Sequence, residues 1–136
     1  MNNRYLYRAK RKKDGKWVEG AYYIEPYTDK CFIIQWNSTG LGFNEFIEVD
    51  GASVCQCTGL KDKNGKLILE NDIVEAWSQG RCAIGKIKHR IDGTWIMYPA
   101  WQNGEMWYLL PNDEGITTVE VIGNIFDNPE MLEVGE

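Results

Sequence analysis

The 136-residue sequence lacks the segments and motifs that most readily reveal a protein's class. No apolar run approaches the roughly 20 residues that a membrane-spanning helix needs. The N-terminus shows no apolar stretch and cleavage site of a secretory signal. There is one histidine, and neither a Gly-x-Ser-x-Gly nor a His-Glu-x-x-His motif is present. We therefore expect a cytoplasmic protein with no transmembrane segment.

The cysteines and the net charge indicate the redox state of the thiols and the kinds of partner that the protein can attract. The four cysteines are an even number, but 43% of the residues are hydrophobic and no export signal is visible, so we expect reduced thiols. A net charge of -5 argues against general adhesion to nucleic acid or anionic lipid. The charge is unevenly distributed, because residues 1–30 contain eight bases and four acids.

Short runs rich in Val, Ile, Tyr and Trp, without a long apolar stripe at helical spacing, predict a mainly β protein of antiparallel strands. Turn dipeptides such as Asp14-Gly15 and Asn64-Gly65 separate these runs. We expect strands at 5–9, 17–24, 31–36, 43–49, 54–58, 73–77, 83–90, 94–101, 106–110 and 117–126.

The spacing of these strands predicts an SH3-like or similar small curled barrel in the C-terminal half. A short C-terminal helix is expected to follow, with Asn128 as its cap, Pro129 in its first position and Glu130 at the positive end of its dipole. We expect one domain, 1–136, with possible sub-lobes 1–58 and 59–136.

Aromatic residues are plentiful, with six tryptophans and seven tyrosines. Five of them fall on one predicted hairpin around Asn103-Gly104, namely Trp95, Tyr98, Trp101, Trp107 and Tyr108. Alternation places Trp95 and Trp101 on one face and Tyr98 on the other, so they cannot all enter one core. Such rings suit a protein interface or stacking on bases, and they equally suit the filling of a small barrel.

A basic cluster lies on the first predicted hairpin and is interleaved with Tyr5, Tyr7 and Trp17. Its members are Arg8, Lys10, Arg11, Lys12, Lys13 and Lys16. Bases grouped with aromatic rings are an electrostatic signature of nucleic-acid binding, although a run of charge at a turn is also common as a solvated loop.

The cysteines and the single histidine are candidate zinc ligands. Cys55 and Cys57 share one face of a predicted strand and would need Cys31, Cys82 or His89 to complete a tetrahedral zinc site. Their spacing does not match the paired Cys-x-x-Cys pattern of structural zinc sites, and thiols are often buried in cores. We therefore expect no metal and no other cofactor.

Two groups of carboxylates are candidate catalytic residues. Glu70, Asp72 and Glu75 cluster, and Asp113 and Glu114 form a second acidic pair. Paired carboxylates suit acid–base chemistry or divalent cations, but charges at turns and strand edges also arise to keep sheets from aggregating. No partner residue fixes a catalytic role for them, so we expect no enzymatic activity.

Three blocks, at 57–66, 70–74 and 121–130, together with Arg8-Ala9 in the first strand, resemble the phage and prophage YopX-like family. The resemblance runs from about residue 5 to residue 132. The sequence has Asn71-Asp72 where that family usually has Gly-Asp, and Asn retains the turn because it tolerates the left-handed conformation. The blocks are expected to serve turns, a strand start and a helix start, not reaction chemistry.

The resemblance implies a phage or prophage accessory protein in the cytoplasm of a bacterial host. We expect it to act by binding a protein partner or a second copy of itself through the aromatic hairpin. The alternative is a nucleic-acid-binding module that uses the basic N-terminal hairpin.

Overall fold

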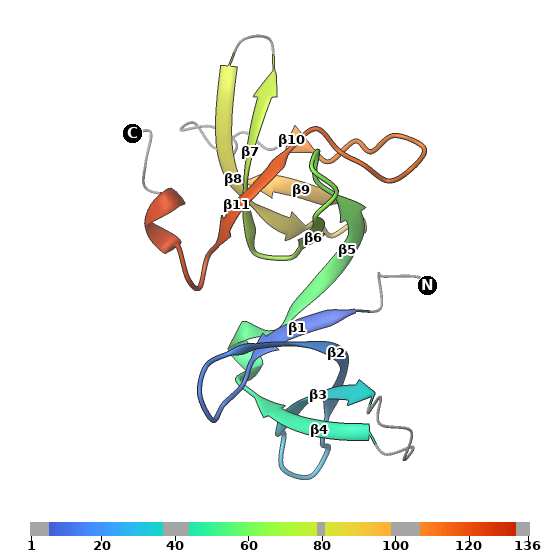
Figure 1. The fold of residues 1–136 in the computed structure, drawn as a ribbon, viewed down its shortest axis with the longest axis vertical. Helices are drawn as coiled ribbons and strands as arrows, with labels where there is room; N and C mark the ends of the chain where they lie inside the picture. Colours follow the sequence, from blue (N-terminus) through green and yellow to red (C-terminus); the bar gives the residue numbers. More distant parts are fainter. Residues whose placement is uncertain (1–5, 37–43, 79–80, 99–106, 133–136) are drawn as a thin grey trace. The chain divides into compact units, whose positions relative to one another are not determined.

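The computed structural model describes residues 6–36, 44–78, 81–98 and 107–132. Short antiparallel strands make up most of the regular structure in these ranges, with two 3₁₀ turns (Figure 1). The strands are β1 (Tyr7–Lys10), β2 (Trp17–Ile24), β3 (Cys31–Trp36), β4 (Asn44–Val49), β5 (Cys55–Lys61), β6 (Leu67–Leu69), β7 (Asp72–Ser78), β8 (Arg81–His89), β9 (Trp95–Tyr98), β10 (Trp107–Tyr108) and β11 (Glu120–Asn124). The chain divides into two compact units, Met1–Cys57 and Thr58–Glu136.

The first unit is a strongly curled antiparallel meander. Its strand order is β4-β3-β2-β1, and the first residues of β5 pair with β1. The curl brings Arg11, just after β1, into a bridge with Val49 at the end of β4. Ala9, Ile33 and Val49 are buried inside the curl. Backbone hydrogen bonds thus join the ends of β1 and β4 around this small core.

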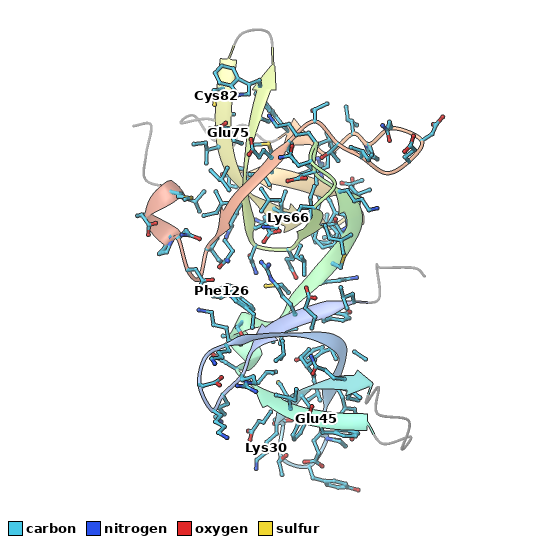
Figure 2. All side chains as sticks on the ribbon, viewed as in Figure 1. Lys30, Glu45, Lys66, Glu75, Cys82 and Phe126 are labelled. Carbon is cyan, nitrogen blue, oxygen red and sulfur yellow. The ribbon has the colours of Figure 1, made fainter. Side chains whose placement is uncertain are left out.

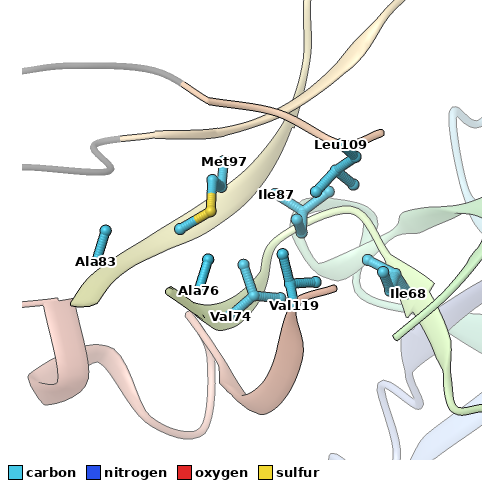
Figure 3. Packing of buried hydrophobic residues seen from close by; sticks show 8 residues of the cluster. All are labelled: Ile68, Val74, Ala76, Ala83, Ile87, Met97, Leu109 and Val119. Carbon is cyan, nitrogen blue, oxygen red and sulfur yellow. The ribbon is translucent and has the colours of Figure 1, made fainter. Parts of the chain in front are cut away.

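The second unit contains a five-stranded antiparallel sheet of order β10-β9-β8-β7-β11, and β5 continues into this unit to pair with β6. One side of the sheet supplies most of a compact aliphatic core (Figure 3). The core residues are Ile68, Val74, Ala76, Ala83, Ile87, Met97, Leu109 and Val119. Each fully buried large aliphatic side chain contributes about 1.5–3 kcal/mol through the hydrophobic effect, so this core is the main stabilising feature of the unit.

The predicted turns at Asp14-Gly15 and Asn64-Gly65 are confirmed. Gly15 and Gly65 have φ values of 74° and 86°, in the left-handed region that a residue without Cβ enters readily. Asn71 also adopts a left-handed conformation, with φ 69°. The turn that the Asn71-Asp72 pair was expected to preserve is therefore present between β6 and β7.

The mainly β fold is confirmed, but two finer expectations are not. In the described ranges the sheet of the C-terminal half does not close into a barrel, since its order ends at β10 and β11. Among the described residues, β10 pairs with β9 and β11 pairs with β7, and these two edge strands do not pair with each other. The C-terminal helix is not confirmed either, because Pro129–Leu132 forms a 3₁₀ turn and the Asn128 side chain accepts a hydrogen bond from Asn124 N at 3.3 Å.

The helical segments of the described residues are all too short to cross a lipid bilayer.

Candidate functional site

The predicted aromatic hairpin is divided between the two sides of the second sheet. Alternation along β9 and β10 places Trp95 and Trp107 on the side of the core, against which both are packed and half-buried. Tyr98 and Tyr108 lie on the opposite side and are 38% and 46% exposed. Trp101 lies outside the described residues. The hairpin thus contributes its described tryptophans to the core and its tyrosines to the surface.

A cationic side chain lies over the ring of each of these two tyrosines. Lys88 Nζ lies 5.5 Å from the ring centroid of Tyr98, and the guanidinium carbon of Arg90 lies 5.6 Å from that of Tyr108. Arg90 also donates a hydrogen bond to the Tyr108 hydroxyl and lies 3.5 Å from a carboxylate oxygen of Asp92. These contacts hold the exposed rings in place by cation–π attraction.

A surface hollow of about 380 Å³ opens beside the hairpin. Trp77 and Leu110, which line it, are 63% and 78% exposed, and Tyr108 lines it as well. Buried Met97 and Val119 also belong to the lining, so the hollow reaches the core of the second unit. Large apolar side chains exposed around a hollow are characteristic of interaction sites.

The six bases of the predicted cluster are all described, but they lie in different surroundings. Arg8 and Lys10 on β1 lie over the ring of Trp17, at 4.7 and 5.2 Å from its centroid. Lys13 and Lys16 are exposed in the turn between β1 and β2. Residues 10–16 are called the basic turn below.

Two bases of the basic turn form ion pairs. Arg11 is paired with Asp14, and Lys12 Nζ lies 3.6 Å from Glu48 Oε2 on β4. The hydrogen bond from Arg11, helped by that from the backbone of Lys16, lowers the pKa of Asp14 to about 2. The turn is therefore a mixed-charge surface in which bases outnumber acids.

Two hollows adjoin the basic turn. One of about 430 Å³ is lined by bases of the turn and by β4, through Arg11, Lys12, Lys13, Glu45, Phe46, Ile47 and Glu48. The other, of about 690 Å³, has four bases and three acids in its lining. The smaller hollow is the one that joins bases to an exposed aromatic ring.

Sequence reasoning missed an aromatic cluster in the first unit, formed by Tyr23, Phe32 and Phe46. The strand register places Tyr23 opposite Phe32, and Phe46 opposite Ile34, on the side facing away from buried Ile33. The three ring centroids are 6.3–6.4 Å apart, and Tyr23 and Phe46 are 41% and 57% exposed. The sequence pattern that could have revealed this cluster is the period-2 alternation on 31–36 and 43–49. It places Phe46 on the side of the sheet opposite to its neighbours in the chain, which face the core side.

The single histidine, His89, contacts two residues of the β8–β9 hairpin. His89 is exposed at the end of β8, and its imidazole stacks on Trp95 with ring centroids 4.2 Å apart. Its Nε2 lies 3.1 Å from the carbonyl oxygen of Gly93 in the following turn. The residue is thus used for local structure.

The cysteines are distributed over both units. Cys55 and Cys57 are 0% and 1% exposed and share the buried side of β5, while Cys31 and Cys82 are half-buried. All four lie in the described residues, and none forms a disulfide. Within those residues, no three or more His, Cys, Asp or Glu side chains gather into a group that could hold a metal ion.

Cys82 lies close to Glu75 on the neighbouring strand (Figure 2). Burial raises the pKa of the Cys82 thiol, and the charge and hydrogen bond of Glu75 raise it further. The nucleophilic form of cysteine is the thiolate, so a thiol with a raised pKa is poorly suited to attack a substrate.

Two of the carboxylates singled out in the sequence, Asp72 and Glu75, lie on β7. Asp72 is 1% exposed, and its Oδ2 accepts a hydrogen bond from Leu69 N at 2.8 Å across the turn into β7. Glu75 lies opposite Glu120 of β11, which is 3.4 Å from Lys63 Nζ. The buried member of the group therefore fixes a turn.

Asp62, in the block 57–66, connects two distant segments. Its Oδ1 accepts hydrogen bonds from the backbone N of Asn64 and Lys66, both at 2.9 Å, and its Oδ2 accepts one from Val121 N at 3.0 Å. Burial alone would raise the pKa of Asp62, but these three hydrogen bonds outweigh it, and the pKa lies below its usual value of 3.8.

The other two blocks also meet through the backbone. Ile125 N donates a hydrogen bond to the carbonyl of Asn71 at 3.0 Å. A Cβ on Gly123 would lie 2.6 Å from Oδ1 of Asn128, so only glycine leaves room for that side chain. All three blocks that carry the resemblance are thus joined in the second unit by contacts that build the fold.

Comparison with known proteins adds one assignment. No curated protein matches this sequence closely enough to serve as a relative. The model of the family described as YopX protein matches residues 6–133, which includes all three blocks and nearly the whole chain. The chain therefore belongs to the YopX family.

Proposed function

We propose that this YopX family protein is a phage accessory protein that acts by binding a protein partner. The observation that supports this function is the 380 Å³ hollow of the second unit, where Trp77, Tyr108 and Leu110 are exposed beside the core. Tryptophan and tyrosine are enriched among residues that dominate binding energies at protein interfaces. The expected occupant is a large apolar side chain of the partner.

A non-catalytic role is consistent with the surroundings of the reactive groups. His89 stacks on Trp95, burial and Glu75 raise the pKa of Cys82, and Asp72 accepts a backbone hydrogen bond. Each group is engaged in a structural contact. A catalytic site needs such groups to act on one reacting atom together.

Native mass spectrometry of the untagged protein, alone and after incubation with an extract of infected host cells, identifies the occupant. A second protein retained on the chain supports a heterologous partner. Integer multiples of the 15.7 kDa chain mass indicate that a second copy fills the role. A chain that stays bare in both samples contradicts the proposal.

Two substitutions locate the surface. Trp77→Ala and Leu110→Ser should each weaken the association about tenfold or more, since removing a central apolar anchor commonly costs above 1 kcal/mol. Ile91→Ser is the matched control, because Ile91 is fully exposed in the same unit and does not line the hollow. Isothermal titration with the purified partner measures the affinities, and equal values for all three variants would place the site elsewhere.

A further inference from the structure

We infer that the first unit also binds single-stranded nucleic acid, using the aromatic cluster of Tyr23, Phe32 and Phe46 together with the basic turn. This site lies entirely within residues 1–57 and is independent of the apolar hollow assigned to a protein partner. Its elements are exposed rings on one side of a sheet and the cations of the basic turn, which lies beside the end of β4. Proteins that bind single strands without strong sequence preference combine these two features.

The aromatic cluster provides the stacking surface. Tyr23 and Phe46 are 41% and 57% exposed to water. Burying aromatic rings of this size usually stabilises the folded state, so their exposure here is unusual. Phe32 contacts both rings and fixes their positions on adjacent strands. Since every base has a flat π-face, exposed and pre-positioned rings can stack on successive bases.

The basic turn provides the charge. Lys12 and Lys13 line the 430 Å³ hollow together with Phe46, so a phosphate in the hollow would lie near a stacked base. Glu48 lines the same hollow and is paired with Lys12, at 3.6 Å. Ion pairs at the surface contribute little, so a phosphate can compete with this carboxylate for the lysine.

The distribution of charge along the chain directs a polyanion to this unit. Residues 1–57 contain eight bases and seven acids, whereas residues 58–136 contain seven bases and thirteen acids. A nucleic acid is therefore repelled by the second unit and not by the first.

Stacking also selects the form of the nucleic acid. In a duplex the bases are stacked on each other and their faces are not available to protein rings. In a single strand the bases can be splayed out and stacked on aromatic side chains. The site should thus prefer single strands over duplexes of the same length, which a purely electrostatic surface would not do.

Fluorescence anisotropy of a labelled oligothymidylate of about 15 nucleotides, titrated with the full-length protein at about 50 mM salt, tests the inference. Phe46→Ala should weaken binding about tenfold, as expected for the loss of one stacked base. Lys13→Gln should lower the slope of log affinity against log salt by about 0.7, the value for one phosphate contact on a single strand.

Matched controls come from the same unit. Tyr27 is 94% exposed but lies outside the aromatic cluster, and Lys30 is exposed just before β3, outside both the basic turn and the 430 Å³ hollow. Tyr27→Ala and Lys30→Gln should therefore leave the affinity within about twofold of the unchanged protein. If Phe46→Ala does not fold, as judged by circular dichroism, Tyr23→Ala takes its place.

Three results would overturn the inference. The first is no change in anisotropy at about 100 µM protein, which would mean that affinity is below even typical non-specific binding. The second is equal affinity for a duplex of the same length. The third is unchanged affinity in folded Phe46→Ala and Tyr23→Ala proteins, which would mean that the rings do not contact the bases.

Discussion

At the scale of single residues, one carboxylate holds two segments of the second unit together. Asp62 fixes the turn that follows β5 through Asn64 and Lys66, and it also binds the backbone of β11 at Val121. Such a group is costly to replace, because three backbone N–H donors would lose their acceptor in a largely buried site. The same interactions favour the charged carboxylate, which links the fold to pH.

Asp62→Asn should lower the free energy of unfolding at neutral pH by about 1–3 kcal/mol, because one acceptor oxygen becomes a donor. The folded-state pKa of Asp62 is lowered, so the stabilisation is complete above the unfolded-state value near 3.8 and is lost as pH falls through the folded-state value. The variant should thus lose less stability than the unchanged protein on acidification below about pH 4. Urea unfolding measured at neutral and acidic pH checks both effects.

Asp92→Asn is the control for this experiment. The pKa of Asp92 is also lowered, mainly by hydrogen bonds from Thr94, but this side chain is exposed in a hairpin turn. We expect a change within about 0.5 kcal/mol, as for most surface substitutions. An equal loss of stability in the two variants would show that the hydrogen bond from Val121 to Asp62 adds nothing to the free energy of unfolding.

Asn71 gives a second prediction at this scale. Its φ of 69° strains any residue with a Cβ, and Asn tolerates this better than Ala does. Replacing Asn71 by Gly or by Ala removes the same side-chain contacts, but only Gly removes the strain. Asn71→Gly should be about 1 kcal/mol more stable than Asn71→Ala in thermal unfolding, and the reverse order would contradict the backbone explanation.

At the scale of elements, the close approach of β2 and β3 depends on Gly20. A Cβ on this residue would lie 2.3 Å from the carbonyl oxygen of Ile34, a backbone atom that can move only if the strands separate. Sequence patterns located β2 and β3 themselves, because alternation and turn residues are local signals. They did not reveal this contact, since it is set by how sharply the sheet curls.

Gly20→Ala should destabilise the first unit by about 2 kcal/mol or more, as overpacking against a rigid neighbour does. Gly15→Ala is the matched comparison, because Gly15 has a φ of 74° but no atom lies within 4 Å of its would-be Cβ. It should cost about 1 kcal/mol from backbone strain alone. Guanidinium unfolding of both variants tests the difference, and equal costs would mean that the sheet can open at Gly20 without penalty.

At the scale of the whole molecule, stability comes from two separate cores. One contains Ala9, Ile33 and Val49, and the other is centred on Ile68, Ile87 and Met97, with no residue in common. Ile33→Ala should lower hydrogen-exchange protection in β1–β4, and Ile87→Ala in β7–β9, each by about 2–5 kcal/mol. Uniform loss of protection along the chain in either variant would mean that the two units unfold as one.

The strand-rich fold, the positions of the main turns and the family follow from local patterns, because period-2 alternation, the Asp-Gly and Asn-Gly pairs and the three blocks can all be read along the chain. The folded chain was needed to show that Trp95 and Trp107 pack on a core while Tyr98 stays exposed, and that Phe46 contacts Tyr23 beside the basic turn. These outcomes depend on the register and curl of strands distant in the sequence. Local sequence patterns do not specify the register and curvature of strands that are distant in the chain.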